Sequence, residues 1–88
     1  MRLKRHKQFL KDFKKIALTD GQFEKFIQFV HCLQENLPLP AESKDHALKG
    51  QFSDCREFHL GGDVLIIYMQ INDEVILMRL GSHAQLFE

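Results

Sequence analysis

One strand-length run of apolar residues constrains the fold of this chain more than any other feature. The segment 64–71 is nearly all apolar, which is typical of a strand buried on both faces of a sheet. Its longest uninterrupted stretch, Val64 to Met69, is far too short to span a bilayer, since a membrane helix needs about 20 apolar residues. The segment therefore predicts a buried sheet strand and no membrane span.

Turn signals and neighbouring strands surround this segment. Gly61-Gly62 precedes it, and Asn72-Asp73 follows it as a pair suited to a hairpin turn. Residues 55–60 alternate in character as a strand does, and residues 74–80 run back along the central segment. Together these segments predict an antiparallel meander. The first of its strands has two distinct faces, with Arg56 and Phe58 on one and Cys55, Glu57 and His59 on the other.

Two amphipathic segments precede the meander. Residues 7–18 and the segment that ends near Asn36 both carry apolar side chains at helical spacing. Between them, Thr19 and Gln22 have the spacing of a capping box, which predicts a tight turn into the second helix. A short strand at 2–5 comes first. The predicted order is β-α-α-β-β-β, an α+β fold in which a helical hairpin packs on one face of a small antiparallel sheet.

Composition places the chain in a broad class without naming a function. Its 88 residues predict one domain, 1–88, and no signal peptide, because no uninterrupted apolar stretch follows the charged N-terminus. Cys32 and Cys55 indicate no disulfide framework, so we expect a reduced, cytoplasmic protein. Basic and acidic residues balance at 12 each, yet seven basic ones lie within residues 1–15 beside a single acid, Asp12. Such a segment can bind an anionic polymer or an acidic protein, or form a solvated helix face.

Polar residues at the edges of the predicted strands form a candidate site. His46 lies in a loop of about a dozen residues that follows the Leu-Pro-Leu-Pro segment, His59 and Asp63 flank the glycine turn, and His83 follows the last strand. Histidines exchange protons near neutral pH, and several of them beside carboxylates suit metal-free acid–base cleavage of a phosphodiester. Glu57 shares a strand face with His59, so the two side chains can interact. Asp63 can equally be a plain turn residue, and His46 can close its own loop.

Three further side chains could bind a nucleic acid. Arg56 and Arg79 could clamp a phosphate, or they could form structural ion pairs. Phe87 could stack on an unpaired base, or it could pack the tail onto the sheet. The three candidate histidines are 13 and 24 residues apart and include no i,i+4 pair, so the spacing supports neither a metal site nor another cofactor.

These motifs in combination are specific, although no single one is. They are Asp45-His46-Ala47-Leu48-Lys49-Gly50, Arg56-Glu57-Phe58-His59, Asp63-Val64-Leu65-Ile66-Ile67-Tyr68 and Arg79-Leu80-Gly81-Ser82-His83-Ala84-Gln85-Leu86-Phe87. Together they resemble the YafQ branch of the RelE superfamily of bacterial toxins, over nearly the full chain.

The resemblance implies an mRNA interferase, the toxin of a type II toxin–antitoxin system that cuts messenger RNA, typically on the translating ribosome. It also implies a microbial-RNase-like α+β fold, a cognate antitoxin that wraps around the toxin, and contact with operator DNA only through the antitoxin complex. Carried over by motif, the catalytic set is His46, His59, Asp63 and His83, with Glu57 in support, Phe87 positioning the RNA, and Arg56 and Arg79 as further RNA-binding candidates. The chemistry we infer is metal-free attack by the 2′-OH. Either His83 is the acid and His59, supported by Asp63, the base, or the roles are reversed.

The sequence is also compatible with two other functions. ParE-like toxins of the same superfamily act on gyrase without cutting RNA, and that alternative would gain if His46, His59 and His83 lay far apart. A plain RNA-binding module would use the basic N-terminal segment, and its binding would be salt-sensitive and leave RNA uncut.

Overall fold

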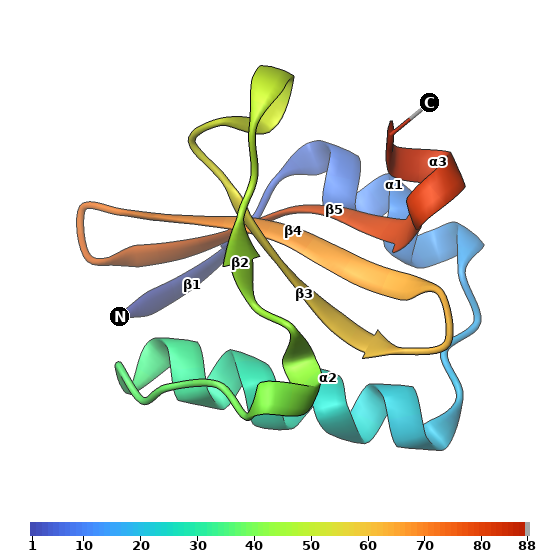
Figure 1. Ribbon diagram of the computed structural model, residues 1–88, viewed down its shortest axis with the longest axis horizontal. Helices are drawn as coiled ribbons and strands as arrows, with labels where there is room; N and C mark the ends of the chain where they lie inside the picture. Colours follow the sequence, from blue (N-terminus) through green and yellow to red (C-terminus); the bar gives the residue numbers. More distant parts are fainter. Residues whose placement is uncertain (88) are drawn as a thin grey trace.

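The structure, a computed structural model, describes residues 1–87 of the chain. Its helices and strands follow one another along the chain as β1 (Arg2–Arg5), α1 (Lys7–Lys15), α2 (Asp20–Gln34), β2 (His46–Ala47), β3 (Arg56–Gly61), β4 (Val64–Ile71), β5 (Glu74–Ser82) and α3 (His83–Phe87), with short 3₁₀ helices η1 (Ala41–Ser43) and η2 (Gly50–Phe52) on either side of β2. Figure 1 shows the strands crossing the middle of the molecule, with α2 beneath them and α3 at the far end of β5. The predicted α+β fold is confirmed. Within the described residues, no helix is long and apolar enough to cross a membrane.

The strands form one sheet, which differs from the predicted one in two respects. Within residues 1–87 it has five strands in the order β1-β5-β4-β3-β2, because the two-residue strand β2 adds to the edge beside β3. The sheet is mixed and not purely antiparallel, because β1 runs parallel to β5. Glu74, the first residue of β5, lies 3.7 Å from Arg2 and 3.1 Å from Lys4, and these ion pairs favour that arrangement of two distant segments.

The sheet is covered on both faces, as the apolar run of β4 requires. The larger core lies between the sheet and the helices α1 and α2, and its largest members include Phe9, Phe29, Phe58 and Tyr68. The opposite face carries a smaller core of Cys55, Leu65, Ile67 and Leu86, against which Leu48, Phe52, Met69 and Met78 pack. Since Leu65 and Ile67 alternate with Ile66 and Tyr68, β4 supplies both cores at once.

The two long helices form as predicted, but their connection is longer. Thr19 and Gln22 make both hydrogen bonds of the capping box, at 3.1 and 3.0 Å. The first helix ends at Lys15 and not near residue 18, because Ile16 is extended and packs with Leu18 against the larger core. An extended link therefore joins the helices in place of a tight turn.

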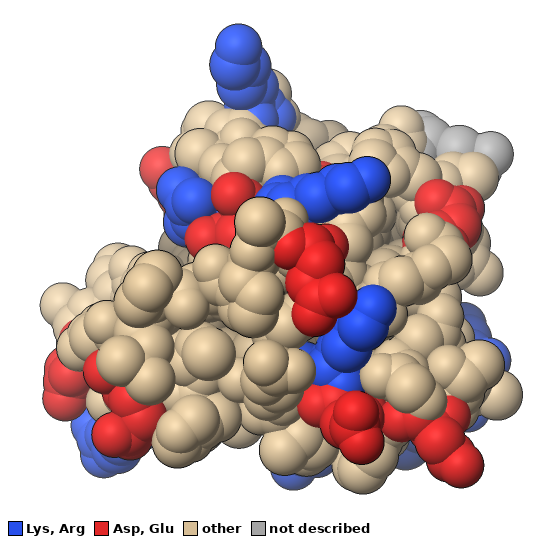
Figure 2. All heavy atoms as spheres, turned by 60° about the horizontal axis from the view of Figure 1, so that its bottom comes forward, with Lys and Arg blue, Asp and Glu red and all other residues tan. Residues whose placement is uncertain are grey.

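Charged side chains on the α2 side of the molecule are of mixed sign. Figure 2 shows lysine and arginine side chains next to aspartate and glutamate on this side, without a broad area of one charge. The basic side chains of the N-terminal segment are exposed but differ in their partners, since Arg2 and Lys4 on β1 pair with Glu74 on β5 and the lysines of α1 do not. This difference weakens the case for a continuous basic RNA-binding face.

One partly buried contact fixes α1 to the sheet. The Asp12 carboxylate accepts hydrogen bonds from Arg79 Nε at 2.8 Å, from Arg79 Nη2 at 3.3 Å and from the Leu80 amide at 3.0 Å. Burial by itself would raise the pKa of Asp12, but these donors outweigh it and lower the pKa below its ordinary value. The ionised carboxylate therefore stabilises the folded chain.

We expect Asp12→Asn to lower the free energy of unfolding at neutral pH by about 1–2 kcal/mol, because one partner of a charged hydrogen-bonded pair is lost. A carboxyl with a lowered folded-state pKa stabilises the protein above its unfolded-state pKa, and this contribution disappears as the pH falls through the folded-state pKa. Urea titrations between about pH 7 and pH 2 should therefore show a smaller acid-induced loss of stability in Asp12→Asn than in the wild type. Asp54→Asn, at an exposed turn residue, is the control; equal pH curves for Asp12→Asn and the wild type would contradict the assignment.

Candidate functional site

The candidate site lies on the sheet face opposite α1 and α2. Glu57 on β3 pairs with His46 on β2 and with Ile67 on β4, and His59 pairs with Leu65. Residues directly opposite one another on neighbouring strands share a sheet face. Since Leu65 and Ile67 belong to the smaller core, the two histidines and Glu57 lie beside that core.

A buried carboxylate stands at the centre of the site. Glu57 is 1% exposed, and its Oε2 atom lies 2.6 Å from His59 Nε2 and 3.7 Å from His46 Nε2. Burying a carboxylate is costly unless hydrogen-bond donors or a positive charge compensate it. The donor here is His59 Nε2–H, as expected from the shared strand face of the two residues.

The hydrogen bonds of both imidazoles fix which nitrogen carries the proton. Nδ1 of His46 lies 2.7 Å from the Lys44 carbonyl oxygen, which can only accept, so Nδ1–H is the donor and Nε2 is the free nitrogen of the neutral ring. Lys44 has a left-handed backbone (φ 51°), which turns its carbonyl toward His46. In His59 the bond to Glu57 occupies Nε2, so Nδ1 is the proton acceptor of the neutral ring.

The aromatic rings of the site follow one another across this face. The ring centroids of His46 and His59 are 6.4 Å apart, those of His59 and His83 6.3 Å, and those of His83 and Phe87 4.9 Å. We call these four side chains the histidine row. Phe52 on η2 packs edge-on against Phe87 at 5.6 Å, so the loop before β3 supports the end of the row. The three predicted histidines are therefore brought together, which removes the argument for a gyrase-binding toxin that rested on their separation.

His83 is held by the cap of a helix that the sequence analysis missed. Residues 83–87 form α3 and not a plain tail, because Ser82 and Gln85 make a reciprocal cap: the Ser82 amide donates to Gln85 Oε1 at 2.8 Å, and the Gln85 amide donates to Ser82 Oγ at 3.2 Å. A Cβ on Gly81 would lie 2.9 Å from Gln85 Oε1, so a larger residue there would force the Gln85 side chain to shift. The Ser-x-x-Gln spacing was the available signal, since it is the same capping-box pattern that predicted α2.

The remaining predicted residues do not join the histidine row. Asp63 is exposed in the turn between β3 and β4, and within residues 1–87 its side chain makes no hydrogen bond. The carboxylate that accompanies His59 is thus Glu57. Arg56 points to the opposite face, where it donates to Asp45. Arg79 pairs with Ile67 and so shares the face of the row, but its Nε and Nη2 are bound to Asp12.

The row lies on an open surface. The side chain of His46 is 55% exposed, His83 is exposed, and Phe87 is 37% exposed, whereas His59 is 22% exposed at its side chain. Among the described residues, no three His, Cys, Asp or Glu side chains are placed to hold a metal ion. The arrangement offers neighbouring imidazoles for giving and taking protons, one of them backed by a buried carboxylate, with an aromatic ring at the end for stacking.

Comparison with known families places the chain in one of them. A family model described as "Bacterial toxin of type II toxin-antitoxin system, YafQ" matches residues 1–88. A protein named mRNA interferase toxin YafQ, from Escherichia coli strain K12, is 35% identical over 81 residues, which cover 91% of this chain and 88% of the relative.

Two solved structures share the fold closely. A copper-bound mutant toxin from Helicobacter pylori superposes with a TM-score of 0.85 at 38% identity, covering 98% of both chains. A chain of the Escherichia coli DinJ–YafQ complex superposes with a TM-score of 0.83 at 32% identity, covering 100% of both chains.

The cap at Ser82 can be tested in the isolated chain. We expect Ser82→Ala to lower the free energy of unfolding by about 1 kcal/mol and to speed hydrogen exchange at the Gln85 amide, because that amide loses its acceptor. Ser82→Thr keeps a hydroxyl acceptor and should behave like the wild type. Measurement is by urea denaturation and amide exchange; unchanged exchange at Gln85 in the alanine variant would show that Ser82 does not cap α3.

Proposed function

The chain belongs to the YafQ family of toxins of bacterial type II toxin–antitoxin systems, and we propose that it is an endoribonuclease that cuts messenger RNA at the histidine row. The observation that carries this proposal is the contact between His59 and buried Glu57, at 2.6 Å, with the His83 ring 6.3 Å away. Within residues 1–87, His59 has a carboxylate partner and His83 has none, so the two neighbouring imidazoles differ in their surroundings. Acid–base cleavage needs such a pair, one ring that accepts a proton and one that donates a proton.

The reaction is a transfer within the RNA chain. His59 Nδ1 takes the proton of the 2′-OH, and the 2′ oxygen attacks the adjacent phosphorus. The bond from phosphorus to the 5′ oxygen breaks in line with the attack, and His83 gives its proton to that leaving oxygen. The products are a 2′,3′-cyclic phosphate and a 5′-OH. DNA lacks the 2′ hydroxyl, so the same site leaves it uncut.

Glu57 takes the supporting role that the sequence analysis gave to Asp63. Its carboxylate accepts from His59 Nε2 and so holds the ring with Nδ1 free for the 2′ proton. Once His59 is protonated, the adjacent buried anion stabilises the imidazolium, as a carboxylate does in other histidine–carboxylate pairs. Asp63, exposed at the turn, we place at the rim of the site, where it can contact the RNA.

His46 and Phe87 flank the reacting pair. His46 lies on the far side of His59 from His83, and its Nε2 becomes a donor when the ring is protonated, which suits a non-bridging phosphate oxygen. Phe87 is exposed beside His83 and braced by Phe52, so its ring can stack on the base next to the cut. Arg79 can add positive potential to this face while bound to Asp12.

Because the histidine row lies on an open surface and not in a cleft, we infer that another molecule positions the RNA substrate. His46, His83 and Phe87 are all exposed, and a pocket of about 480 Å³ lies on the opposite face beside Asp45 and Arg56. We therefore propose that the ribosome presents the messenger to the toxin, which sets its site of action in the cytoplasm. The lysines of α1 would contact ribosomal RNA.

A cognate antitoxin is the proposed protein partner. The Escherichia coli relative was solved in a complex with DinJ. In this chain large apolar side chains of α1 and α2 are exposed, and a partner would remove them from water: they are Leu10, Phe13, Phe23 and Ile27. Contact with operator DNA would come through that complex.

The proposed mechanism assigns all proton transfers to side chains. The copper-bound state is that of the Helicobacter pylori toxin. Among the described residues of this chain no group of three suitable ligands is found, and Glu57 accepts a hydrogen bond from His59 Nε2.

The roles of the two histidines can be separated with a better leaving group. A messenger with sulfur in place of the 5′ oxygen at the cut needs little help from a general acid, because a thiolate leaves without protonation. On ordinary mRNA in programmed ribosomes, we expect His83→Ala and His59→Ala each to slow cleavage by roughly 10²–10⁴-fold. On the sulfur-substituted messenger, His83→Ala should cut nearly as fast as the wild type, whereas His59→Ala should stay slow.

Rescue of His59→Ala in place of His83→Ala would show that the roles are reversed, and rescue of neither variant would contradict acid catalysis by either residue. The same reactions without ribosomes should give no cleavage. Cuts at equal rates in free RNA would contradict the ribosome-dependent part of the proposal.

A further inference from the structure

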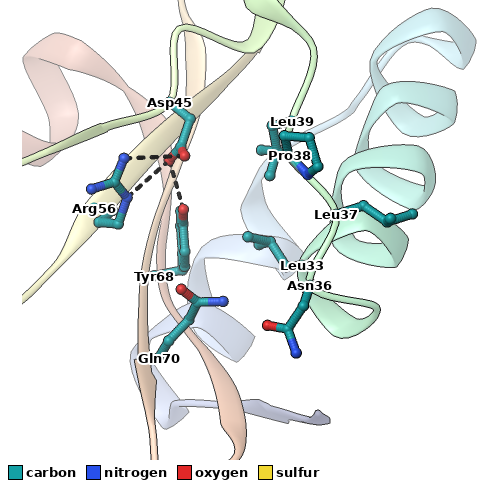
Figure 3. A pocket seen from close by; sticks show the side chains of 9 residues that line it. All are labelled: Leu33, Asn36, Leu37, Pro38, Leu39, Asp45, Arg56, Tyr68 and Gln70. Atoms are coloured by element: carbon teal, nitrogen blue, oxygen red, sulfur yellow. Dashed lines mark hydrogen bonds and ion pairs between the residues drawn. The ribbon is translucent and has the colours of Figure 1, made fainter.

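A hydrogen-bonded network lies directly behind the histidine row, on the other face of the sheet. The Tyr68 hydroxyl donates to Asp45 Oδ1 at 2.6 Å, and Arg56 donates through Nε at 3.3 Å and through Nη2 to Oδ2 at 3.2 Å. Figure 3 shows Arg56 and Tyr68 converging on this one carboxylate from two strands, β3 and β4. Asp45 immediately precedes His46 in the chain, so the network ends where the row begins.

The strand that carries His46 needs such an anchor. β2 consists of two residues at the edge of the sheet, paired with Glu57 and Arg56. Both residues of β2 are exposed, so side-chain packing holds them less firmly than it holds the inner strands. A two-residue edge strand frays easily unless something else holds it.

Asp45 supplies that anchor from the chain position before the strand. Its carboxylate ties the backbone to β3 and β4, and the left-handed Lys44 just before it presents the carbonyl that accepts from His46 Nδ1. The geometry points to Asp45 as a positioning residue that sets the place and the ring orientation of His46, with Tyr68 and Arg56 holding Asp45. This inference rests on the proposed ribonuclease function, because it gives His46 a task in cleavage.

A pocket lies beside the network. Its volume is about 480 Å³, and Leu33, Leu37 and Leu39 are among its other lining residues. Figure 3 shows Leu33 and Leu39 across the opening from Tyr68 and Asp45, and Leu37 pointing away from them. This space beside the carboxylate lets Asp45 shift when one of its hydrogen-bond donors is removed.

Tyr68 is the donor that a point mutation can remove most cleanly. The residue is 1% exposed, and its ring stays in the larger core when phenylalanine replaces it. Burial and the adjacent Asp45 raise the pKa of Tyr68 well above its ordinary value, so its hydroxyl remains a donor throughout the working pH range. The bond to Asp45 likewise raises the pKa of Arg56, which stays charged.

We expect Tyr68→Phe to slow mRNA cleavage on programmed ribosomes by about 10-fold, because a displaced catalytic group costs up to about 100-fold per ångström. Ile66→Val is the matched control, since Ile66 lies in the same strand and core but does not touch Asp45. The control should retain its cleavage rate at a similar loss of stability.

Testing Tyr68→Phe in a variant that lacks His46 distinguishes the positioning of His46 from a general loss of structure. In His46→Ala, adding Tyr68→Phe should change the rate less than 2-fold, because the side chain that the network positions is already gone. An equal 10-fold loss in both backgrounds would overturn the inference, and so would a Tyr68→Phe rate equal to that of Ile66→Val.

The tautomer of the His46 imidazole shows whether the network positions this ring, and it can be measured without a cleavage assay. In the ¹H–¹⁵N spectrum of the wild-type toxin, recorded at a pH at which the ring is neutral, we expect the His46 proton on Nδ1, and in Tyr68→Phe a mixture of both tautomers with faster proton exchange. An unchanged His46 ring in Tyr68→Phe would overturn the inference. Failure of the wild type to cut mRNA would refute the proposed function, while the spectrum would still decide whether the network positions His46.

Discussion

The buried carboxylate of Glu57 is the constraint on which the site depends. At 1% exposure it needs a donor, and His59 at 2.6 Å is the one that the structure supplies. That single contact fixes the tautomer of His59, and His46 Nε2 lies 3.7 Å from the same oxygen. An apolar residue at this position would suit the adjacent core better, so the carboxylate is best understood through the imidazoles that it orients.

The two faces of the sheet have different roles in this short chain. One face is given to the larger core under α1 and α2, and the other combines a small core with the histidine row. Two contacts between distant segments connect the two faces of the sheet. Asp12 on α1 binds Arg79, which shares the face of the row, while Asp45 on the opposite face precedes His46. The residues of the histidine row are therefore positioned by contacts that cross the sheet, and they lie on an open surface.

Local signals in the sequence predicted what local interactions determine. The bounds of β1, the capping box at Thr19 and the shared face of Glu57 and His59 all follow from residues near one another in the chain. Contacts between distant residues could not be predicted in this way. Glu74 on β5 pairs with Lys4 on β1 across 70 residues, and Asp45, which precedes β2, accepts from Tyr68, 23 residues away. Residues 83–87 were a different case, because the Ser-x-x-Gln signal for their helix was present in the sequence.

The most direct test of this account is the rate of mRNA cleavage by Glu57→Gln on programmed ribosomes. Glutamine keeps the shape and an oxygen acceptor for His59 but carries no charge to stabilise an imidazolium. Glu24→Gln, at an exposed position on α2, is the matched control. We expect a fall of about 100-fold or more for Glu57→Gln, with the control unchanged and both variants folded. Cleavage by Glu57→Gln at the wild-type rate would contradict the central role of the buried carboxylate.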